Sequence, residues 1–284
     1  MKSLEKQHPR IKPASPEEWG GAAYALGAHR SGDVITFAVF SRRATRIMLE
    51  IYDAPTGQDA VFACWMEKNP KDNVFRAKLR GCQKNTIYGF RCWGPNWVYD
   101  EEWCRGGSLA GFVSDFDALG NRFNPNKVLF DPYARELSHD RAAVERILTQ
   151  DGQVWKTPDA RATRKAISDD PIWAFATGPL PHCGVPARSL DTARLAPKGI
   201  EIIESTSTGK RPFLPPEHAI IYEAHVRGAT NHVSSSRLAC LLRGLDGFEK
   251  VVSVPPHLRG TYAGAALWAP YLRAMGFTTI ELLP

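Results

Sequence analysis

Residues 34–52 read VITFAVFSRRATRIMLEIY, and the fold is decided by the two apolar runs in this stretch. The first seven residues are β-branched and aromatic, which is typical of a buried strand. In the last seven, apolar residues occupy alternate positions and predict a strand face directed at a core: Ile47, Leu49 and Ile51. Met48 and Glu50 are expected on the opposite face of the same strand.

Three further strand-like segments follow at spacings of roughly 10 to 14 residues: 61–66, 74–79 and 86–93. Turn residues separate the segments, as in DAPTG at 53–57. Short strands separated by turns at regular intervals are typical of an antiparallel β-sandwich. We therefore expect this fold between about Gly20 and Trp93, after a polar, flexible lead-in over residues 1–18.

The second half of the chain has a different pattern. Regular structure is sparse from about 134 to 216, where repeated prolines leave only a possible short helix over 141–148. Beyond it, AIIYEAHV at 219–226 and FTTIELL at 277–283 predict two buried strands of a parallel sheet. An apolar stripe ending near Met275 predicts a helix between them, shortened to about two turns if Pro270 lies in its first turn. Strand, helix and strand form a βαβ unit.

Six motifs follow one another along the chain: YGFRCWGPNW at 88–97, GFVSD at 111–115, NRFNPNK at 121–127, DPYA at 131–134, IYEAHVRG at 221–228 and RGTYAG at 259–264. In this order they resemble one known family, the bacterial isoamylases and glycogen-debranching enzymes of the α-amylase superfamily (glycoside hydrolase family 13). The ELLP end at 281–284 continues the resemblance. Each motif alone is a weak signal, but their common order makes the resemblance specific.

The resemblance implies a β-sandwich of the family-48 carbohydrate-binding type, which is immunoglobulin-like, followed by a (β/α)₈ TIM barrel. The expected domains are a lead-in at 1–18, the sandwich at 19–133, an irregular connector at 134–216 and the start of the barrel at 217–284. A complete barrel takes about 250 residues, so we expect strands 1 and 2 only and an incomplete barrel.

In the family, the reaction is hydrolysis of α-1,6 branch linkages in glycogen or amylopectin by a retaining mechanism with two carboxyl groups. The resemblance places the catalytic carboxylates on later barrel strands, so no catalytic residue is assigned within residues 1–284. The function that we expect is therefore the N-terminal portion of such an enzyme, without activity of its own. The alternative is a standalone glucan-binding or regulatory protein derived from one.

Trp97, Tyr99 and Trp103 are the candidate carbohydrate-binding residues. Their flat rings follow the predicted strand end at Trp93, where few apolar neighbours surround them. One interpretation is a platform on which glucose rings stack, because the C–H face of a sugar packs on an aromatic face. The other is that the rings fix the sandwich to the segments that follow it.

Four carboxylates are candidates for other chemistry. Glu223 and Glu281 lie on the two predicted parallel strands and are expected to be structural. Asp115 and Asp117 are oxygen ligands of the type that calcium prefers, but no further ligands are identified. We expect no metal site and no cofactor. His225 and Arg227, on alternate strand positions, are expected to point the same way.

The segment 230–255 is longer than the loop that the resemblance predicts there, and its four leucines at 238, 241, 242 and 245 suggest a short helical stripe. The expected partners are an α-glucan ligand and a second polypeptide that completes the barrel. The net charge of +6 comes from interleaved acids and bases, which argues against a nucleic-acid surface. No apolar run has the length of a signal peptide or membrane span, so a cytoplasmic location with free thiols is expected.

Overall fold

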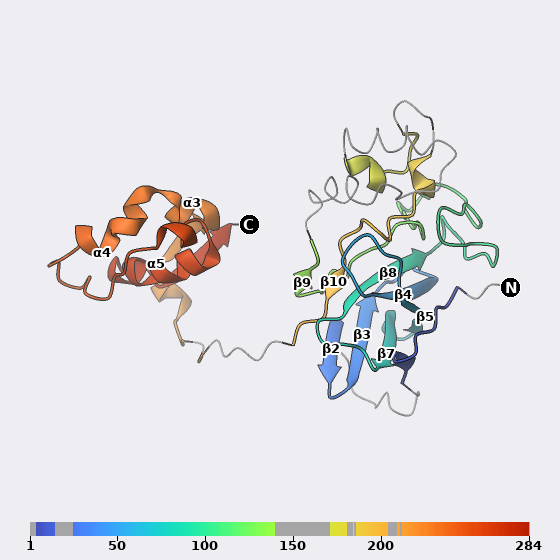
Figure 1. Ribbon diagram of the computed structural model, residues 1–284, viewed down its shortest axis with the longest axis horizontal. Coiled ribbons are helices and arrows are strands. Elements are labelled where there is room, and N and C mark those ends of the chain that lie inside the picture. The colour runs from blue at the N-terminus through green and yellow to red at the C-terminus, as the bar shows by residue number, and fades with distance from the viewer. Residues whose placement is uncertain are drawn as a thin grey trace. The chain divides into compact units, whose positions relative to one another are not determined.

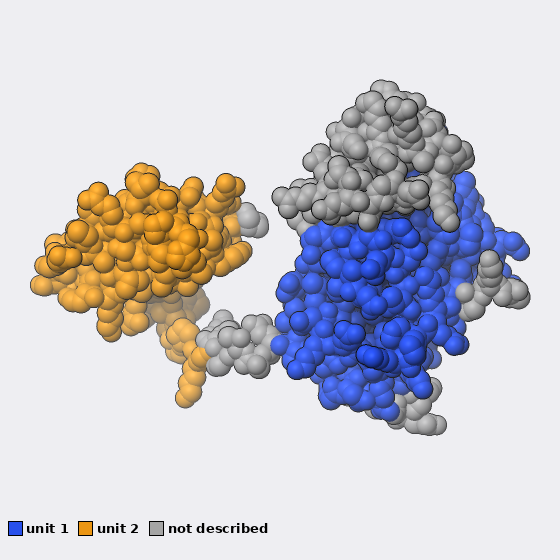
Figure 2. Space-filling model, viewed as in Figure 1, with its two compact units in different colours: residues 1–205 blue, residues 206–284 orange. Residues whose placement is uncertain are grey.

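The computed structural model describes residues 4–14, 25–139, 171–180, 184, 186–203, 209–210 and 212–283. The chain divides into two compact units, Met1–Ser205 and Thr206–Pro284 (Figures 1 and 2). The helix expected over 141–148 lies outside the described residues. Each unit has its own hydrophobic cluster and is described by itself.

Unit 1 contains two antiparallel sheets. In the first sheet the strand order is β1 (Lys12–Pro13), β7 (Val74–Arg80), β3 (Val34–Phe40) and β2 (Gly27–Ser31), with β6 (Glu67–Asn69) also paired to β7. In the second sheet the order is β5 (Phe62–Trp65), β4 (Arg46–Tyr52), β8 (Ile87–Trp93), β10 (Gly199–Ile200) and β9 (Glu136–Leu137). The strands β4 and β8 pair along seven residues, from Arg46 opposite Trp93 to Tyr52 opposite Ile87.

The main core of unit 1 takes side chains from both sheets. From β4 it takes the alternate residues that the sequence predicted, Ile47, Leu49 and Ile51, and β3 contributes Ile35 and Phe37. All five are at most 3% exposed. The antiparallel β-sandwich predicted from the sequence is therefore confirmed.

The opposite face of the second sheet is also buried. Four side chains point away from the main core and nevertheless have no exposed surface: Met48, Glu50, Arg91 and Trp93. The segment after β8 and residues 186–198 cover this face: an Arg91 guanidinium nitrogen donates to Pro125 O at 2.7 Å and another pairs with Asp191 at 2.9 Å. Part of the predicted connector thus packs on the sandwich.

Unit 2 contains β11 (Ile221–His225), α3 (Val226–Asn231), α4 (Leu238–Leu241), α5 (Tyr262–Ala274) and β12 (Thr279–Leu283). β11 and β12 are parallel neighbours, with Ile221 opposite Thr279 and His225 opposite Leu283. Short 3₁₀ turns complete both units: η3 (Pro171–Phe175), η4 (Ala187–Ser189), η5 (Pro216–His218), η6 (Val233–Arg237) and η7 (Pro256–Leu258). That these elements are the first part of a (β/α)₈ barrel stays a prediction.

Three local predictions in unit 2 need correction. Helix α5 spans 13 residues and contains Pro270 in its interior, because Thr261 caps it earlier by accepting from Gly264 N at 3.1 Å. Arg227 lies in helix α3, whose N-cap is His225, so the two residues do not alternate along a strand. The leucine stripe forms only the four-residue α4, and Leu241 is 56% exposed.

Among the described residues, no helix is long and apolar enough to cross a membrane.

Candidate functional site

The aromatic corner lies at one end of the second sheet, and we define it as Trp65, Trp93, Trp97, Tyr99 and Trp103. These rings belong to one hydrophobic cluster with Met48 and Ala63. Trp65 ends β5, Trp93 ends β8, and the other three follow β8 in a segment of turns. The pairing of β5 with β4, and of β4 with β8, brings Trp65 and Trp93 to a centroid distance of 5.3 Å.

Two of the three residues predicted to bind carbohydrate are inside the protein. Trp97 and Trp103 are each 1% exposed. The Trp97 ring meets Phe112 edge to face, and its Nε1 donates to Ala110 O at 2.9 Å. The Trp103 ring meets Trp93 edge to face at 5.1 Å. A buried ring offers no face to a sugar, so these two side chains act as packing elements in this structure.

Tyr99 is the predicted residue that reaches the surface, where it is half-buried. Its ring meets Trp65 edge to face at 5.2 Å, and Trp65 is also half-buried. Trp65 was not predicted as a site residue, because it precedes Tyr99 by more than 30 positions and only strand pairing brings the two together. An aromatic residue at the end of a predicted strand was the available signal.

Arg46 completes the exposed part of the corner. Its guanidinium carbon lies 4.2 Å from the centre of the Tyr99 ring and 5.3 Å from that of Trp65, within the range of cation–π interactions. Among the described residues no hydrogen-bond acceptor is recorded for this exposed guanidinium, so its N–H groups remain available to a ligand. We call Arg46, Trp65 and Tyr99 the aromatic patch.

A network of buried charged side chains packs against the aromatic corner. Glu50, fully buried, pairs with Arg91 at 2.9 Å and Arg105 at 2.6 Å, and accepts from Tyr52 Oη at 2.6 Å. Burial by itself raises the pKa of Glu50, but the charges of Arg91 and Arg105 outweigh it and lower the pKa to about 2. The Arg91 guanidinium in turn lies 5.6 Å from the centre of the Trp103 ring. Glu50 and Arg91 have no exposed surface, so this pair holds the corner in place and does not contact a ligand.

Lys127 fixes the covering segment to the same face. Its Nζ donates to the carbonyl oxygens of Ala174, Ala187 and Leu190 at 2.8, 2.7 and 2.9 Å. Burial lowers the pKa of this lysine to about 7. Since all three acceptors are backbone groups of one segment, Lys127 acts as a structural clamp.

The two aspartates considered as calcium ligands have protein partners. Asp115 accepts from Arg188 Nε at 2.7 Å, and Arg188 also lies over the Phe112 ring. Asp117 accepts from the backbone N of Leu119 and from the backbone and side chain of Asn121. Within the described ranges, no three His, Cys, Asp or Glu side chains are grouped so that they could hold a metal ion.

Glu223 and Glu281 are direct register partners on β11 and β12. Both side chains are exposed, whereas Ala224 and Leu282 line an apolar cavity of about 240 Å³ together with residues of α5. A general acid needs an environment that keeps it protonated, and this exposed pair has no enclosure that would provide it.

Residues 25–134 match carbohydrate-binding module 48, described as the isoamylase N-terminal domain. The isoamylase of Pseudomonas amyloderamosa is 36% identical over 284 residues, which covers 96% of this chain and 30% of that protein. The isoamylase of a Flavobacterium species is 37% identical over 259 residues, covering 88% of this chain and 27% of that protein.

A glycogen debranching enzyme of Yersinia enterocolitica is 29% identical over 268 residues, covering 93% of this chain and 29% of that protein. The chain thus spans about 30% of the length of these relatives. Among solved structures, the product complex of a multi-modular glycogen-degrading pneumococcal virulence factor superposes with a TM-score of 0.47 at 16% identity, covering 94% of this chain and 20% of that one.

Proposed function

We propose that this chain is the glucan-binding N-terminal portion of an isoamylase-type enzyme. The proposal is based on the family to which residues 25–134 belong, carbohydrate-binding module 48. The relatives that support it are named isoamylase and glycogen debranching enzyme. The ligand class that fits both names is an α-glucan such as glycogen or starch.

The aromatic patch is the surface that we assign to this ligand. Trp65 and Tyr99 offer two half-buried rings at right angles, with an interplanar angle of 88°. Sugar C–H faces pack on such rings, and Arg46 donates to hydroxyl oxygens from the same side. The observation that carries the proposal is this combination, within the module, of two half-buried rings and an exposed guanidinium that lies over them.

Starch retention and affinity for maltoheptaose test the assignment in the full 284-residue chain. We expect wild-type protein to sediment with insoluble starch. Tyr99→Ala and Arg46→Gln should each weaken maltoheptaose binding about tenfold, equivalent to about 1.4 kcal/mol. Tyr133→Ala is the matched control, since Tyr133 is 45% exposed and lies outside the aromatic corner.

Each variant is first checked for cooperative thermal unfolding, so that a loss of binding is not a loss of folding. Retention of the wild type no better than that of an inert protein would contradict glucan binding. Equal weakening by Tyr99→Ala and Tyr133→Ala would contradict the assignment to the aromatic patch and leave glucan binding by another surface.

The proposal for unit 2 is that it forms the beginning of a (β/α)₈ barrel that further strands complete. Among the described residues β11 and β12 pair only with each other, and their exposed apolar residues include Ile221, Ile280 and Leu282. Exposed strand edges with apolar faces recruit further strands. The expected source is another polypeptide segment, and the hydrolysis of α-1,6 branch linkages implied by the resemblance belongs to that complete barrel.

Residues 1–284 alone are accordingly expected to release no reducing ends from amylopectin above a blank. The described pair Glu223 and Glu281 lacks an enclosed site in which one carboxyl group acts as an acid. Release of reducing ends by the purified chain, with contaminating enzyme excluded, would contradict this proposal.

A further inference from the structure

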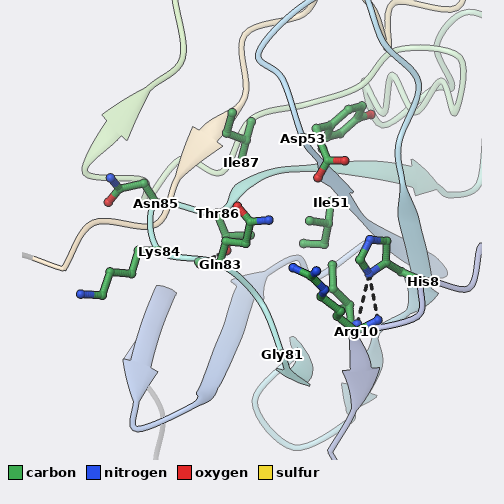
Figure 3. A pocket seen from close by; sticks show the side chains of 12 residues that line it. His8, Arg10, Ile51, Asp53, Gly81, Gln83, Lys84, Asn85, Thr86 and Ile87 are labelled. Carbon is green, nitrogen blue, oxygen red and sulfur yellow. Dashed lines mark hydrogen bonds between the residues drawn. The ribbon is translucent and has the colours of Figure 1, made fainter.

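A small pocket lined by apolar and polar groups lies in unit 1 between three segments, and Figure 3 shows it from close by. The lead-in contributes His8, Arg10 and Ile11, and the end of β4 with the residue after it contributes 51–53. The third side consists of Gly81, residues 83–86 and Ile87, the first residue of β8. The cavity volume is about 70 Å³, roughly that of two water molecules. It therefore admits the hydroxyl-bearing edge of a small ligand and not a whole ring.

The lead-in is a fixed wall of this pocket. β1 pairs with β7, and Ile11 is 7% exposed within the main core. His8 Nδ1 accepts from the backbone N of Arg10 and of Ile11, both at 3.2 Å. Gly81 has a φ of +79°, and a Cβ at this position would lie 2.0 Å from Arg10 O. The backbone of the lead-in therefore lies directly against the loop.

The loop side of the pocket is fixed as well. Thr86 is 5% exposed, and its Oγ1 donates to Gln83 O at 2.6 Å. Arg30, which pairs with Glu201 at 3.0 Å, also donates to Gln83 O. These bonds hold the backbone of Gln83 and leave its side-chain amide unused.

Three polar side chains converge on the space between these walls. Figure 3 shows the guanidinium of Arg10, the amide of Gln83 and the carboxylate of Asp53 directed at the region around Ile51, while Lys84 and Asn85 extend away from it. In the part of the chain that the structure describes, these three converging groups have no recorded hydrogen bond or ion pair with another side chain. Their hydrogen-bonding capacity is open to a ligand.

The chemistry of these groups selects a neutral ligand with hydroxyl groups. Arg10 donates only, the carboxylate oxygens of Asp53 accept, and Gln83 does both. A hydroxyl group both donates and accepts and so satisfies all three, whereas a phosphate would meet the Asp53 carboxylate as a like charge. Ile87, half-buried in the pocket wall, provides aliphatic surface for the C–H groups of a sugar.

We propose that this pocket is a second carbohydrate subsite, which holds the hydroxyl-bearing edge of one α-glucosyl unit between Arg10, Asp53 and Gln83. The inference rests on the proposed glucan binding and adds a contact site that is separate from the aromatic patch. The lead-in is part of this subsite, so glucan binding there depends on residues that precede the family match at 25–134.

Amide chemical shifts of the ¹⁵N-labelled full chain, titrated with maltose, test the subsite. We expect shift changes at the amides of residues 83–87 and 51–53. Asp53→Ala and Gln83→Ala should weaken the affinity measured at these amides at least fivefold. Gln58→Ala is the matched control, because Gln58 is an exposed residue of the neighbouring turn and does not line the pocket.

The two sites give separate signals in the same titration. Tyr99→Ala should remove the shifts near Trp65 and Tyr99 and leave those at 83–87 unchanged. Shifts near the aromatic patch without any at 83–87 would overturn the subsite and leave the proposed function standing. Shifts at 83–87 with inorganic phosphate but not with maltose would identify an anion site and overturn the proposal. No shift at either site would contradict both.

Discussion

Glu50 is a carboxylate with no exposed surface, and it is tied to two cations and a hydroxyl group. Taking an ion pair out of water is costly, so such a group is stable only when its partners are all in place. Here Arg91 shares its charge between Glu50 and Asp191, while Arg105 also donates to Leu4 O at 2.7 Å. The network thus joins the sheet to the segments that cover it.

The lowered pKa of Glu50 predicts a specific acid sensitivity of unit 1. The folded pKa of about 2 lies below the ordinary value of 4.5, so the stabilisation is present above pH 4.5 and is lost as the pH falls toward 2. The total is about 3 kcal/mol, the linkage value for this shift. Urea unfolding at several pH values between 2 and 6 measures it.

Glu50→Gln is the control for this prediction. It should lower the free energy of unfolding at neutral pH by about 3 kcal/mol or more, since Arg91 loses a buried partner. It should also flatten the dependence on pH between 4.5 and 2 relative to the wild type. The same slope in both proteins would show that other carboxylates cause the acid sensitivity.

At the residue scale the sequence predicted which side chains of β4 face the main core, but not that the opposite face is also buried. Ile47, Leu49 and Ile51 are buried as their alternation predicts. Trp97 and Trp103 are buried as well, because Leu4 and the segment after β8, with Ala110 and Phe112, pack against them. Alternation along one strand carries no information about such a cover, and therefore Tyr99 could not be distinguished from its neighbours.

At the element scale, β1 depends on one glycine. Gly81 directly follows β7, and its positive φ and missing Cβ allow the close approach of Arg10 O. The two-residue β1, opposite Leu79 and Arg80, is too short to be stable without that contact.

Gly81→Ala should therefore detach the lead-in. The left-handed backbone costs about 1–2 kcal/mol for alanine, and the overlap with Arg10 O adds to it by displacing the strand. Gly32→Ala is the matched control: Gly32 has a φ of +61° but nothing within 4 Å of an added Cβ. We expect faster hydrogen exchange at Ile11 and Ala14 in the Gly81 variant alone.

Chemical denaturation completes the comparison. The midpoint should fall further in Gly81→Ala than in Gly32→Ala, and the difference measures the contribution of the lead-in. Equal midpoints would mean that the lead-in contributes nothing to the stability of the sandwich.

Strands with an apolar sequence pattern of their own were predicted. Strands that form only because they pair with residues distant in the sequence were not. β3, β4, β7 and β8 were predicted from their apolar residues and turns. β9 and β10 have two residues each and exist because Gly199 pairs with both Tyr88 and Leu137. In α5, helix-forming residues before Pro270 and the packing of Trp268 and Leu272 outweigh the cost of an interior proline.

At the scale of the whole molecule, the two units have separate cores. Unit 2 is organised around Val254, Trp268 and Leu272, none of which belongs to a cluster of unit 1. Separate cores predict two transitions in calorimetric unfolding.

Trp268→Ala should distinguish these transitions. Removing a ring that is 9% exposed from the small core of unit 2 should cost about 3 kcal/mol or more and lower one transition. The other transition should stay at its wild-type temperature. A single transition that moves as a whole would contradict independent cores.

The residues that cover the second sheet determine which fragment of the chain can fold as a separate module. An excised fragment with the limits 25–134 would lack Asp191, which neutralises Arg91, and the Leu4 carbonyl bound by Arg105. It would also leave Lys127 without the three carbonyl groups that it now binds. A fragment that keeps these contacts is therefore longer than the family match at 25–134 and includes residues from about 4 to 201.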